Sequence, residues 1–259
     1  HENSSAASDV YKRQGEDLII NERNGGIYYW DKDEQSTTIT PFLRAKELST
    51  LSGTKRSVPQ KAAQVLLSDR DRHVIAFGSD GLGGSTDAQG NNIQDPMLIR
   101  FSSQESVVDW TPTATNTAGD LRLSKGSEII TAIQTSRQIL VWTDQSLYSM
   151  QFIGAPFTFG VSLIGDNTRI AGPNTAIAVN DIVYWMGQEN FYIYDGRIQA
   201  IPCTVRDYVF SDMNNQQSFK FHVGSIASQT EVWWFYCSSS STEIDRYVVY
   251  NYGQQVWYY

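Results

Sequence analysis

The chain has 259 residues and a formal net charge of −8 at pH 7, with 20 Lys and Arg against 28 Asp and Glu. Tight binding to a nucleic-acid backbone needs clustered Lys and Arg, so the excess of acidic residues argues against such a function. The negative charge fits a surface that DNA slides past without adhering, or a surface whose charge only maintains solubility. No apolar run is long enough to span a membrane, and Cys203 and Cys237 are too few for a disulfide scaffold, so we expect free thiols.

Residues 1–14 are unlike the rest of the chain. Ser4–Gln14 reads SSAASDVYKRQ, and back-translation of this stretch fits a transposon-type sequencing adaptor in one open frame. The alternative is a polar, flexible natural N-terminus. Such segments are excluded from fold reasoning, so we expect residues 1–14 to be disordered. We also expect the chain to be a fragment obtained by environmental sequencing, with one β-rich domain over residues 15–259.

The first predicted elements are strands with one short helix. Asn24-Gly25 between apolar runs predicts a hairpin within Asp17–Asp31. A short helix is predicted over Arg44–Leu51. The next strand pair is Gln64–Leu67 and Val74–Phe77, separated by a polar turn.

A long loop rich in Gly, Asn and Asp follows, from Gly78 to Asn92. It lacks the Gly-Lys-Ser/Thr ending of a phosphate loop and the regular acidic positions of an EF-hand. We predict a hairpin insertion exposed at the rim of the fold. Long loops often carry function, so a solvated insertion and a partner-contact loop both remain open. The candidate contact residues are Gly78, Asp80, Gly83, Asp87 and Asn91.

The second half of the chain is predicted to consist mainly of strands. Trp110 is expected to pack back against the sheet that ends at Phe101. Alternating apolar residues from Phe157 to Leu163 predict a half-buried strand, and Cys203–Met213 predicts a short helix. Further strands are predicted at Leu121–Leu123, Glu128–Gln134, Ile139–Trp142, Ala176–Val179, Phe219–Ile226, Glu231–Tyr236 and Arg246–Tyr252.

An aromatic hairpin recurs along the chain and determines the predicted fold class. Ile139–Trp142 with Ser146–Tyr148 is one copy; the others begin at Ile182 and Val232 and, more loosely, at His73. A strand-based period of about 40–50 residues is typical of β-propellers. We therefore predict an all-β, β-propeller-like array of antiparallel blades, and an incomplete one. The expected blade-core aromatic residues are Trp30, Trp110, Trp142, Tyr148, Trp185, Tyr192, Trp234 and Tyr250.

Motifs for catalysis are missing from the sequence. His73 and His222 are far apart and belong to no metal-ligand spacing. We find no Gly-x-Ser-x-Gly elbow, no dinucleotide fingerprint and no sialidase-type Asp-box. We therefore predict no catalytic, cofactor-binding or metal-binding residues and no enzymatic activity. The alternative is a carbohydrate-binding or glycoside-hydrolysing β-propeller, which needs paired carboxylates and exposed aromatic residues.

Several motifs resemble those of propeller-bearing tail proteins of short-tailed bacteriophages, the tail nozzle (tail tubular protein B) or head-to-tail stabilisation family. They include Leu98-Ile-Arg-Phe-Ser-Ser-Gln-Glu followed by Asp109-Trp-Thr-Pro112, Ile139-Leu-Val-Trp-Thr-Asp-Gln-Ser-Leu-Tyr148, and Asp245-Arg-Tyr-Val-Val-Tyr-Asn251. The resemblance implies a virion structural protein of the tail, assembled in the host cytoplasm. It further implies a homo-oligomeric ring, commonly a hexamer, that joins other tail and portal-adaptor proteins. Double-stranded DNA would pass through this conduit during ejection without sequence-specific binding, and no membrane is involved.

Overall fold

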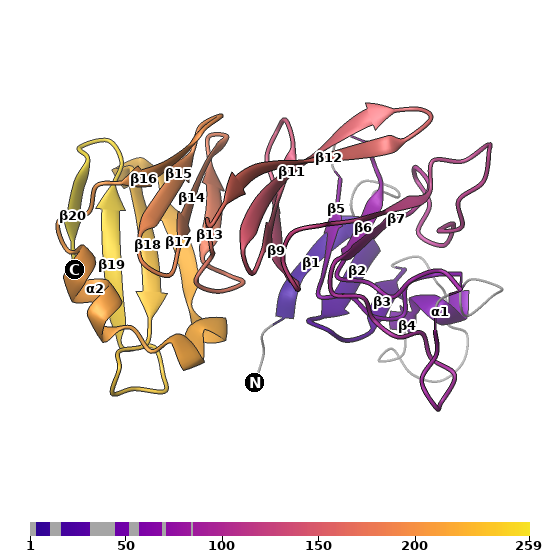
Figure 1. Cartoon of the computed structure of the whole chain (residues 1–259), viewed down its shortest axis with the longest axis horizontal. Helices are drawn as coiled ribbons and strands as arrows, with labels where there is room; N and C mark the ends of the chain where they lie inside the picture. Colours follow the sequence, from indigo (N-terminus) through magenta and orange to yellow (C-terminus); the bar gives the residue numbers. More distant parts are fainter. Residues whose placement is uncertain (1–3, 11–16, 32–44, 52–56, 69–70, 84) are drawn as a thin grey trace. The chain divides into compact units, whose positions relative to one another are not determined.

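The computed structural model describes residues 4–10, 17–31, 45–51, 57–68, 71–83 and 85–259 (Figure 1). The predicted all-β fold of antiparallel blades is confirmed, because these residues form five four-stranded sheets. The chain divides into two compact units. The first comprises His1–Ala132 with Met150–Val161, and the second Ile133–Ser149 with Ser162–Tyr259.

The first sheet has the strand order β1-β2-β3-β4. Residues 1–14 were expected to be disordered, but Ser4–Val10 form strand β1, which pairs antiparallel with β2. The rest of the presumed adaptor, residues 1–3 and 11–14, lies outside the described residues. The predicted Asn24-Gly25 hairpin is confirmed between β2 and β3, with Asn24 at φ 57°. The elements are β1 (Ser4–Val10), β2 (Asp17–Glu22), β3 (Ile27–Trp30), β4 (Ala45–Glu47) and helix α1 (Leu48–Leu51).

The second sheet, β5-β6-β7-β8, belongs to the same unit. Its strands are β5 (Gln64–Leu67), β6 (Val74–Phe77), β7 (Leu98–Phe101) and β8 (Gly119–Arg122). One core cluster joins the first two sheets. It contains Ile19 and Tyr29 of the first sheet, Val65 and Ala76 of the second, and Trp110. The expected return of Trp110 onto the sheet is therefore confirmed.

The third sheet has the order β12-β11-β10-β9. Its strands are β9 (Ile129–Gln134), β10 (Ile139–Thr143), β11 (Ser146–Gly154) and β12 (Thr158–Asp166). Strands β11 and β12 have nine residues each, and the outer end of β11 is exposed. The predicted alternation from Phe157 to Leu163 holds only in part, because Phe159 is buried whereas Phe157 and Leu163 are exposed.

The fourth and fifth sheets lie in the second unit, in the orders β13-β14-β15-β16 and β17-β18-β19-β20. The predicted helix at Cys203–Met213 is confirmed as α2, but it is shorter. The elements are β13 (Ala176–Val179), β14 (Ile182–Met186), β15 (Phe191–Tyr194), β16 (Ile198–Ile201), α2 (Arg206–Asp212), η1 (Asn215–Lys220), β17 (His222–Ile226), η2 (Ala227–Gln229), β18 (Glu231–Tyr236), β19 (Arg246–Asn251) and β20 (Val256–Tyr258).

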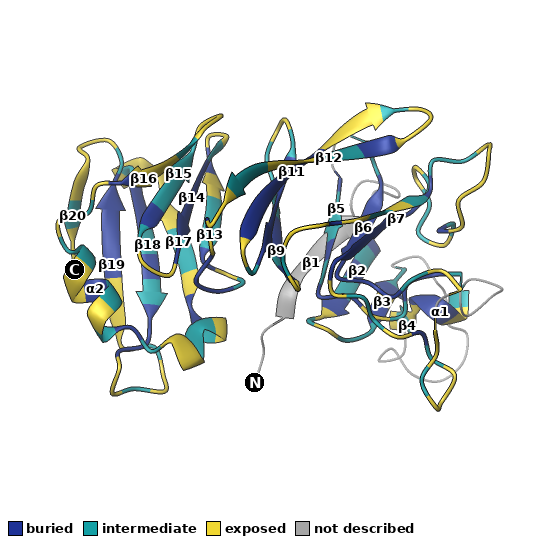
Figure 2. Cartoon of the chain, viewed as in Figure 1, coloured by how far each residue is buried: buried dark blue, intermediate teal, exposed yellow. Residues whose placement is uncertain are grey.

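Tryptophans in the second strand of successive sheets fill the spaces between these sheets. Trp142 of β10 meets Trp185 of β14 edge to face, with ring centroids 5.5 Å apart. Trp234 of β18 meets Phe191 of β15 at 4.9 Å, and its indole N–H donates to the Thr175 carbonyl at 3.0 Å. Figure 2 shows the buried residues along these strands. Since large aromatic side chains each bury much apolar area, these contacts are major sources of stability.

Most of the predicted blade-core aromatic residues are indeed buried. Trp30 and Tyr192 are the exceptions, because both are only half-buried. Successive side chains of a strand point to opposite faces, so Tyr29 and Phe191 occupy the core beside them. The buried residues are Trp110, Trp142, Tyr148, Trp185, Trp234 and Tyr250.

The neighbours Trp233 and Trp234 provide a matched test of this packing. We predict that Trp234→Ala lowers the free energy of unfolding by about 3–5 kcal/mol, the usual cost of removing a buried large aromatic side chain. Trp233→Ala, on the opposite face and only half-buried, should cost much less. Denaturant titration of both variants measures the difference, and equal losses would contradict the assignment of faces.

Candidate functional site

The polar clusters and clefts of the described residues were compared with the requirements of metal and nucleophilic sites. Among the described residues, no three His, Cys, Asp or Glu side chains are grouped so that they could hold a metal ion. Two shallow clefts, of about 500 and 450 Å³, lie beside α2 and β20 and share Cys203 and Thr204. Burial raises the pKa of the Cys203 thiol to about 11, so this thiol is protonated at neutral pH and is a poor nucleophile. None of the helices in the described residues is long and apolar enough to cross a bilayer.

The loop from Gly78 to Asn92 forms the predicted hairpin insertion. Antiparallel bridges join Asp80 to Gln94 and Thr86 to Asn92. Gly78 opens the loop at φ 59°, where an added Cβ would come within 3.1 Å of Ala63 Cβ. A side chain at this position would therefore meet both backbone strain and a tight contact.

Asp80 anchors the base of this loop and is completely buried. Its Oδ1 accepts the backbone N–H groups of Gln60 at 2.7 Å and Lys61 at 2.9 Å. Its Oδ2 accepts Asn92 Nδ2–H at 2.8 Å. The Asp80 carbonyl accepts Arg100 Nη1–H at 3.3 Å. Asp80 is thus a structural residue rather than a surface contact.

Asp87 organises the accessible tip of the loop. Its Oδ1 accepts the backbone N–H of Gln89 at 3.0 Å and of Asn91 at 2.8 Å, and these bonds help to hold the pKa of Asp87 below its ordinary value. Gly83 is exposed, and Asp87 and Asn91 are half-buried. The five predicted contact residues therefore separate into a buried base, Gly78 and Asp80, and an accessible tip.

Residues of the Leu98–Pro112 motif have structural roles. The Arg100 guanidinium is buried and donates to the carbonyls of Ser57 at 2.6 Å and Trp110 at 3.3 Å. Asp109 accepts Asn116 Nδ2–H at 3.0 Å. The motif therefore fastens the segment after β7 onto the second sheet.

The Trp-Thr-Asp-x-Ser-Leu-Tyr pattern also has a structural explanation. Thr143 Oγ1 accepts the backbone N–H of Ser146 at 2.9 Å, which closes the turn between β10 and β11. Ser146 Oγ donates to Asp166 at 3.1 Å. The hydroxyl groups in this pattern thus stabilise a hairpin turn, as is common for Ser and Thr.

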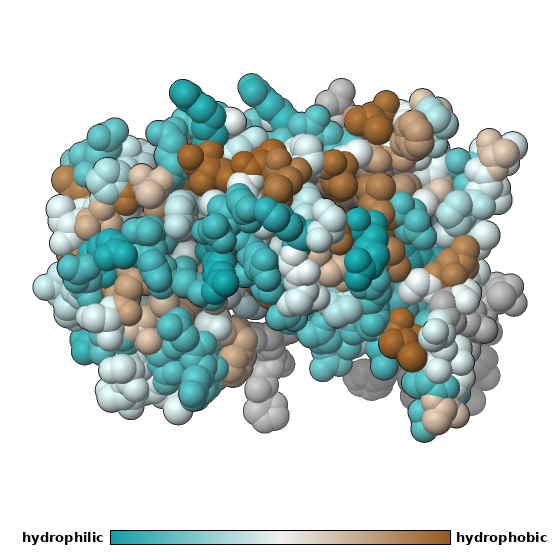
Figure 3. Space-filling view, viewed as in Figure 1, coloured by the Kyte–Doolittle hydropathy of each residue, from teal (hydrophilic) through white to brown (hydrophobic). Residues whose placement is uncertain are grey.

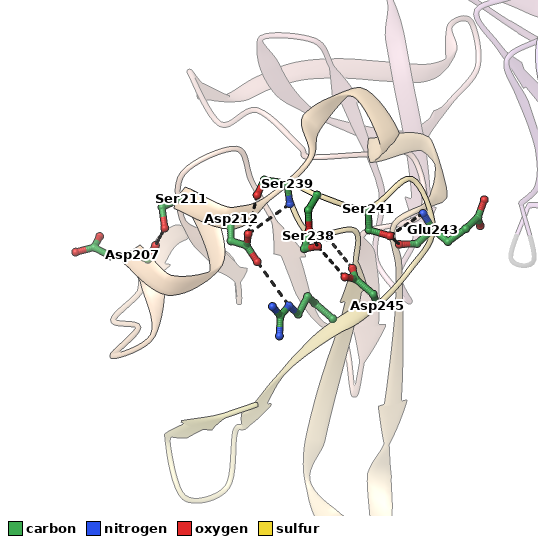
Figure 4. Close-up of polar contacts among 10 residues, drawn as sticks. Asp207, Ser211, Asp212, Ser238, Ser239, Ser241, Glu243 and Asp245 are labelled. Carbon is green, nitrogen blue, oxygen red and sulfur yellow. Dashed lines mark hydrogen bonds and ion pairs between the residues drawn. The ribbon is translucent and has the colours of Figure 1, made fainter.

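A serine-rich loop joins β18 to β19 and is held by carboxylates (Figure 4). Asp245 accepts Ser238 Oγ–H at 2.7 Å and the Ser238 backbone N–H at 2.8 Å. Asp212 accepts Ser239 Oγ–H at 2.8 Å. Although a serine and a carboxylate are adjacent, both side chains are engaged in closing the loop.

The last sheet, β17–β20, carries an aromatic face that the sequence analysis did not single out. His222 stacks on Phe235 at 4.7 Å, and Trp233 stacks on Tyr247 at 5.2 Å. Glu231 accepts Trp233 Nε1–H at 2.9 Å and the Tyr258 hydroxyl, and this second bond raises the pKa of Tyr258 to about 12. We call this surface the last-sheet face; it comprises His222, Trp233, Phe235, Tyr247 and Tyr258.

The first sheet also has an apolar face that is partly exposed among the described residues. Leu18 pairs with Trp30, and Ile20 pairs with Tyr28. These four side chains alternate with the core residues Ile19, Ile27 and Tyr29; Tyr28 is exposed and the other three are half-buried. We call this surface the first-sheet face; it comprises Leu18, Ile20, Tyr28 and Trp30.

A third apolar surface lies at the tip of the β11–β12 hairpin, where Figure 3 shows hydrophobic residues. Ile153 is 56% exposed and Phe157 is 72% exposed. Behind them, the buried His73 ring contacts Phe152 and Phe159 at 5.9 and 5.2 Å. Burial lowers the pKa of His73, although the nearby Asp71 carboxylate partly opposes this shift.

Comparison with known proteins supports the fold alone. No protein-family model matches the chain, and no curated protein sequence matches it. The extracellular domain of BT4673 from B. thetaiotaomicron is similar in structure, with a TM-score of 0.53 and 12% identity. The match covers 99% of this chain but only 28% of that chain. The AfRom2 CNH domain gives a TM-score of 0.49 at 10% identity, covering 97% of this chain and 70% of its own. The putative exported protein BF0058 from Bacteroides fragilis gives a TM-score of 0.41 at 12% identity. This match covers 100% of this chain and 72% of that chain.

Asp80 and Asp87 provide a matched pair for testing the loop. Asp80→Ala leaves the buried Asn92 amide without its acceptor and also removes the acceptor of the Gln60 and Lys61 backbone N–H groups, and a buried donor left unpaired costs about 1–3 kcal/mol. We therefore predict a clear loss of global stability. Asp87→Ala should leave the global free energy of unfolding unchanged and instead speed hydrogen exchange at the Gln89 and Asn91 amides. The reverse pattern would contradict the separation into base and tip.

His73 predicts a dependence of stability on pH. Its pKa in the folded chain lies below the ordinary value of 6.5, so below pH 6.5 the unfolded chain binds a proton that the folded chain does not. The free energy of unfolding should be highest above pH 6.5 and fall as the pH decreases toward the folded-state pKa. Denaturant titration should show a weaker fall for His73→Gln, whereas the exposed His222→Gln retains it. An unchanged pH dependence in His73→Gln would refute this assignment.

Proposed function

We propose that this chain is a structural component of the tail of a short-tailed bacteriophage and forms part of the DNA conduit below the portal. The observation that carries the proposal is that the motifs on which the phage resemblance rests have structural roles: their side chains hold loops and turns against the sheets. Arg100, Trp110 and Thr143 fix loops and turns to the sheets. This is what a virion component that transmits force requires, because its polar residues are used for rigidity rather than for chemistry.

The charge and surface of the chain agree with a passive conduit. A net charge of −8 repels the phosphate backbone, so DNA passes without adhering. The partly exposed aromatic residues of the sheet faces and the hairpin tip provide apolar surface for assembly with other subunits. In this proposal the chain acts in a homo-oligomeric ring with portal-adaptor and other tail proteins.

The genes that flank this coding sequence on its source contig test the proposal. We predict genes for portal, tail-tube and internal virion proteins. Flanking genes for polysaccharide uptake and degradation, with no virion genes, would contradict a tail function. The gene order is independent of how the chain associates in solution.

Carbohydrate binding is the second candidate function, because the last-sheet face carries several aromatic residues. Sugar rings stack on exposed aromatic faces, but here His222 and Phe235 stack on each other, as do Trp233 and Tyr247. Much of the ring surface is therefore already occupied. A glycan array on the purified chain, with Trp233→Ala as the matched variant, distinguishes the two functions: binding that this variant abolishes would favour the carbohydrate function.

A further inference from the structure

Strand β12 is an edge strand that lacks the protection such strands usually have. It lies in the continuous described stretch 85–259, and among the described strands only β11 pairs with it. Proteins keep edge strands from pairing with other chains by making them short or by placing charged side chains on them. β12 has nine residues, Thr158–Asp166, and its single charged residue is the last one. The edge of β12 is therefore suited to accept a further strand.

The last strands of the other described sheets differ from β12. β4 has three residues and carries Lys46 and Glu47, whereas β8 has four residues and carries Asp120 and Arg122. β16 and β20 carry no charge, but they have only four and three residues. Among these strands, β12 alone combines length with an almost uncharged sequence, and most of it is exposed or half-buried (Figure 2).

The whole hairpin that ends in β12 is uncharged. The segment Ser146–Gly165 contains no Asp, Glu, Lys, Arg or His, although the chain has a net charge of −8. Its exposed apolar side chains are Phe152, Ile153, Phe157 and Leu163. Because two copies of an acidic chain repel each other, contact between copies is favoured where neither copy contributes a charge. This hairpin meets that condition.

We propose that β12 of one copy pairs antiparallel with β12 of a second copy about a two-fold axis at Ser162. The sequence of the strand is self-complementary in this register, because each glycine lies opposite a large apolar side chain and Ser162 lies opposite itself. The other pairs are Phe159 with Gly165, Gly160 with Ile164, and Val161 with Leu163. Such cross-strand pairs are the unit of sheet stabilisation, and an aromatic side chain opposite an edge glycine is a recurrent device for fixing register.

A register shifted by one residue is less favourable. It would place Gly160 opposite Gly165 and Phe159 opposite the Asp166 carboxylate. It would also turn the second copy over, because a shift of one residue exchanges the two faces of a strand. The two-fold register at Ser162 instead keeps the buried Phe159 of both copies on the same side of the joined sheet.

Gly160 shows how the side chains would fit. A Cβ added at Gly160 would come within 3.1 Å of Ile153 Cδ1, so Ile153 of β11 already lies over this glycine. In the proposed register, Ile164 of the second copy approaches Gly160 from the other side. Ile153 is 56% exposed in the single chain and would be partly covered by this contact. Apolar side chains from both flanking strands thus fill the space that the glycine leaves.

The size of the contact determines its strength. A strand of this length spans about 25–30 Å, and one strand pair covers much less than the ~800 Å² per partner of a standard interface. The dimer should therefore form in a concentration-dependent manner. A two-fold contact is complete after two copies, so it goes beyond the proposed tail function and is separate from any contact that builds a ring.

Ser162→Lys and Ser162→Asp test the pairing by sedimentation velocity of the full chain over a wide range of concentration. Ser162 is exposed, so neither change disturbs the core. Each variant alone places two like charges directly opposite each other, which should raise the dissociation constant of the dimer about fivefold or more. An equimolar mixture places opposite charges there and should form heterodimers more tightly than either variant pairs with itself.

The control is Ala200→Lys, which adds a charge at an exposed position of the edge strand β16 and should dimerise like the unmodified chain. Unchanged thermal unfolding midpoints establish that the variants are folded. A chain that is monomeric at every concentration, variants that dimerise as tightly as the unmodified chain, or a mixture no tighter than its components would each overturn the pairing through β12. These outcomes leave the tail function standing, since that function is judged by gene order.

Discussion

The architecture depends on aromatic packing between adjacent sheets, which follows from the two-residue period of a β-strand. Because neighbouring side chains point to opposite faces, one strand can supply an aromatic residue to each of two flanking sheets. Strand β14 does so with Tyr184 and Trp185. A four-stranded sheet of this size could not bury enough apolar area alone, so each sheet depends on its neighbours.

The repeat made the fold predictable, whereas residues that act through tertiary contacts were harder to assign. Period and turn chemistry placed the β2–β3, β6–β7, β14–β15 and β18–β19 hairpins close to their observed bounds. The assignment of faces was less secure: Trp30 was expected in the core, but the alternation that buries Tyr29 turns Trp30 outward. Asp80 resembled a surface loop residue because its partners, Gln60 and Asn92, are distant in sequence.

The last-sheet face shows which signal was overlooked. Two consecutive tryptophans in a strand cannot occupy one face, so Trp233 and Trp234 already required an aromatic residue on each side of β18. The sequence alone could not reveal whether another sheet covers the outer one. That depends on neighbours, and the structure leaves Tyr247 and Tyr258 exposed. The same reasoning applies to Tyr28 on the first-sheet face.

The function proposed here follows from how the chain uses its polar groups. Arg100, Asp80 and Thr143 would each attract attention as chemistry-bearing residues, yet their hydrogen bonds all close loops or turns. Some apolar and aromatic side chains also remain exposed on sheet faces and at the tip of a hairpin. These surfaces are consistent with the proposed assembly, and the net negative charge is consistent with a conduit to which DNA does not adhere.

A double-mutant cycle between Phe191 and Trp234 tests the central claim most directly. These rings belong to different sheets and lie 4.9 Å apart. If aromatic contacts hold the sheets together, the single and double alanine variants should give a coupling energy of about 0.5–1.5 kcal/mol in denaturant titration. A coupling energy of zero would mean that the two sheets do not pack through this pair and would contradict the account.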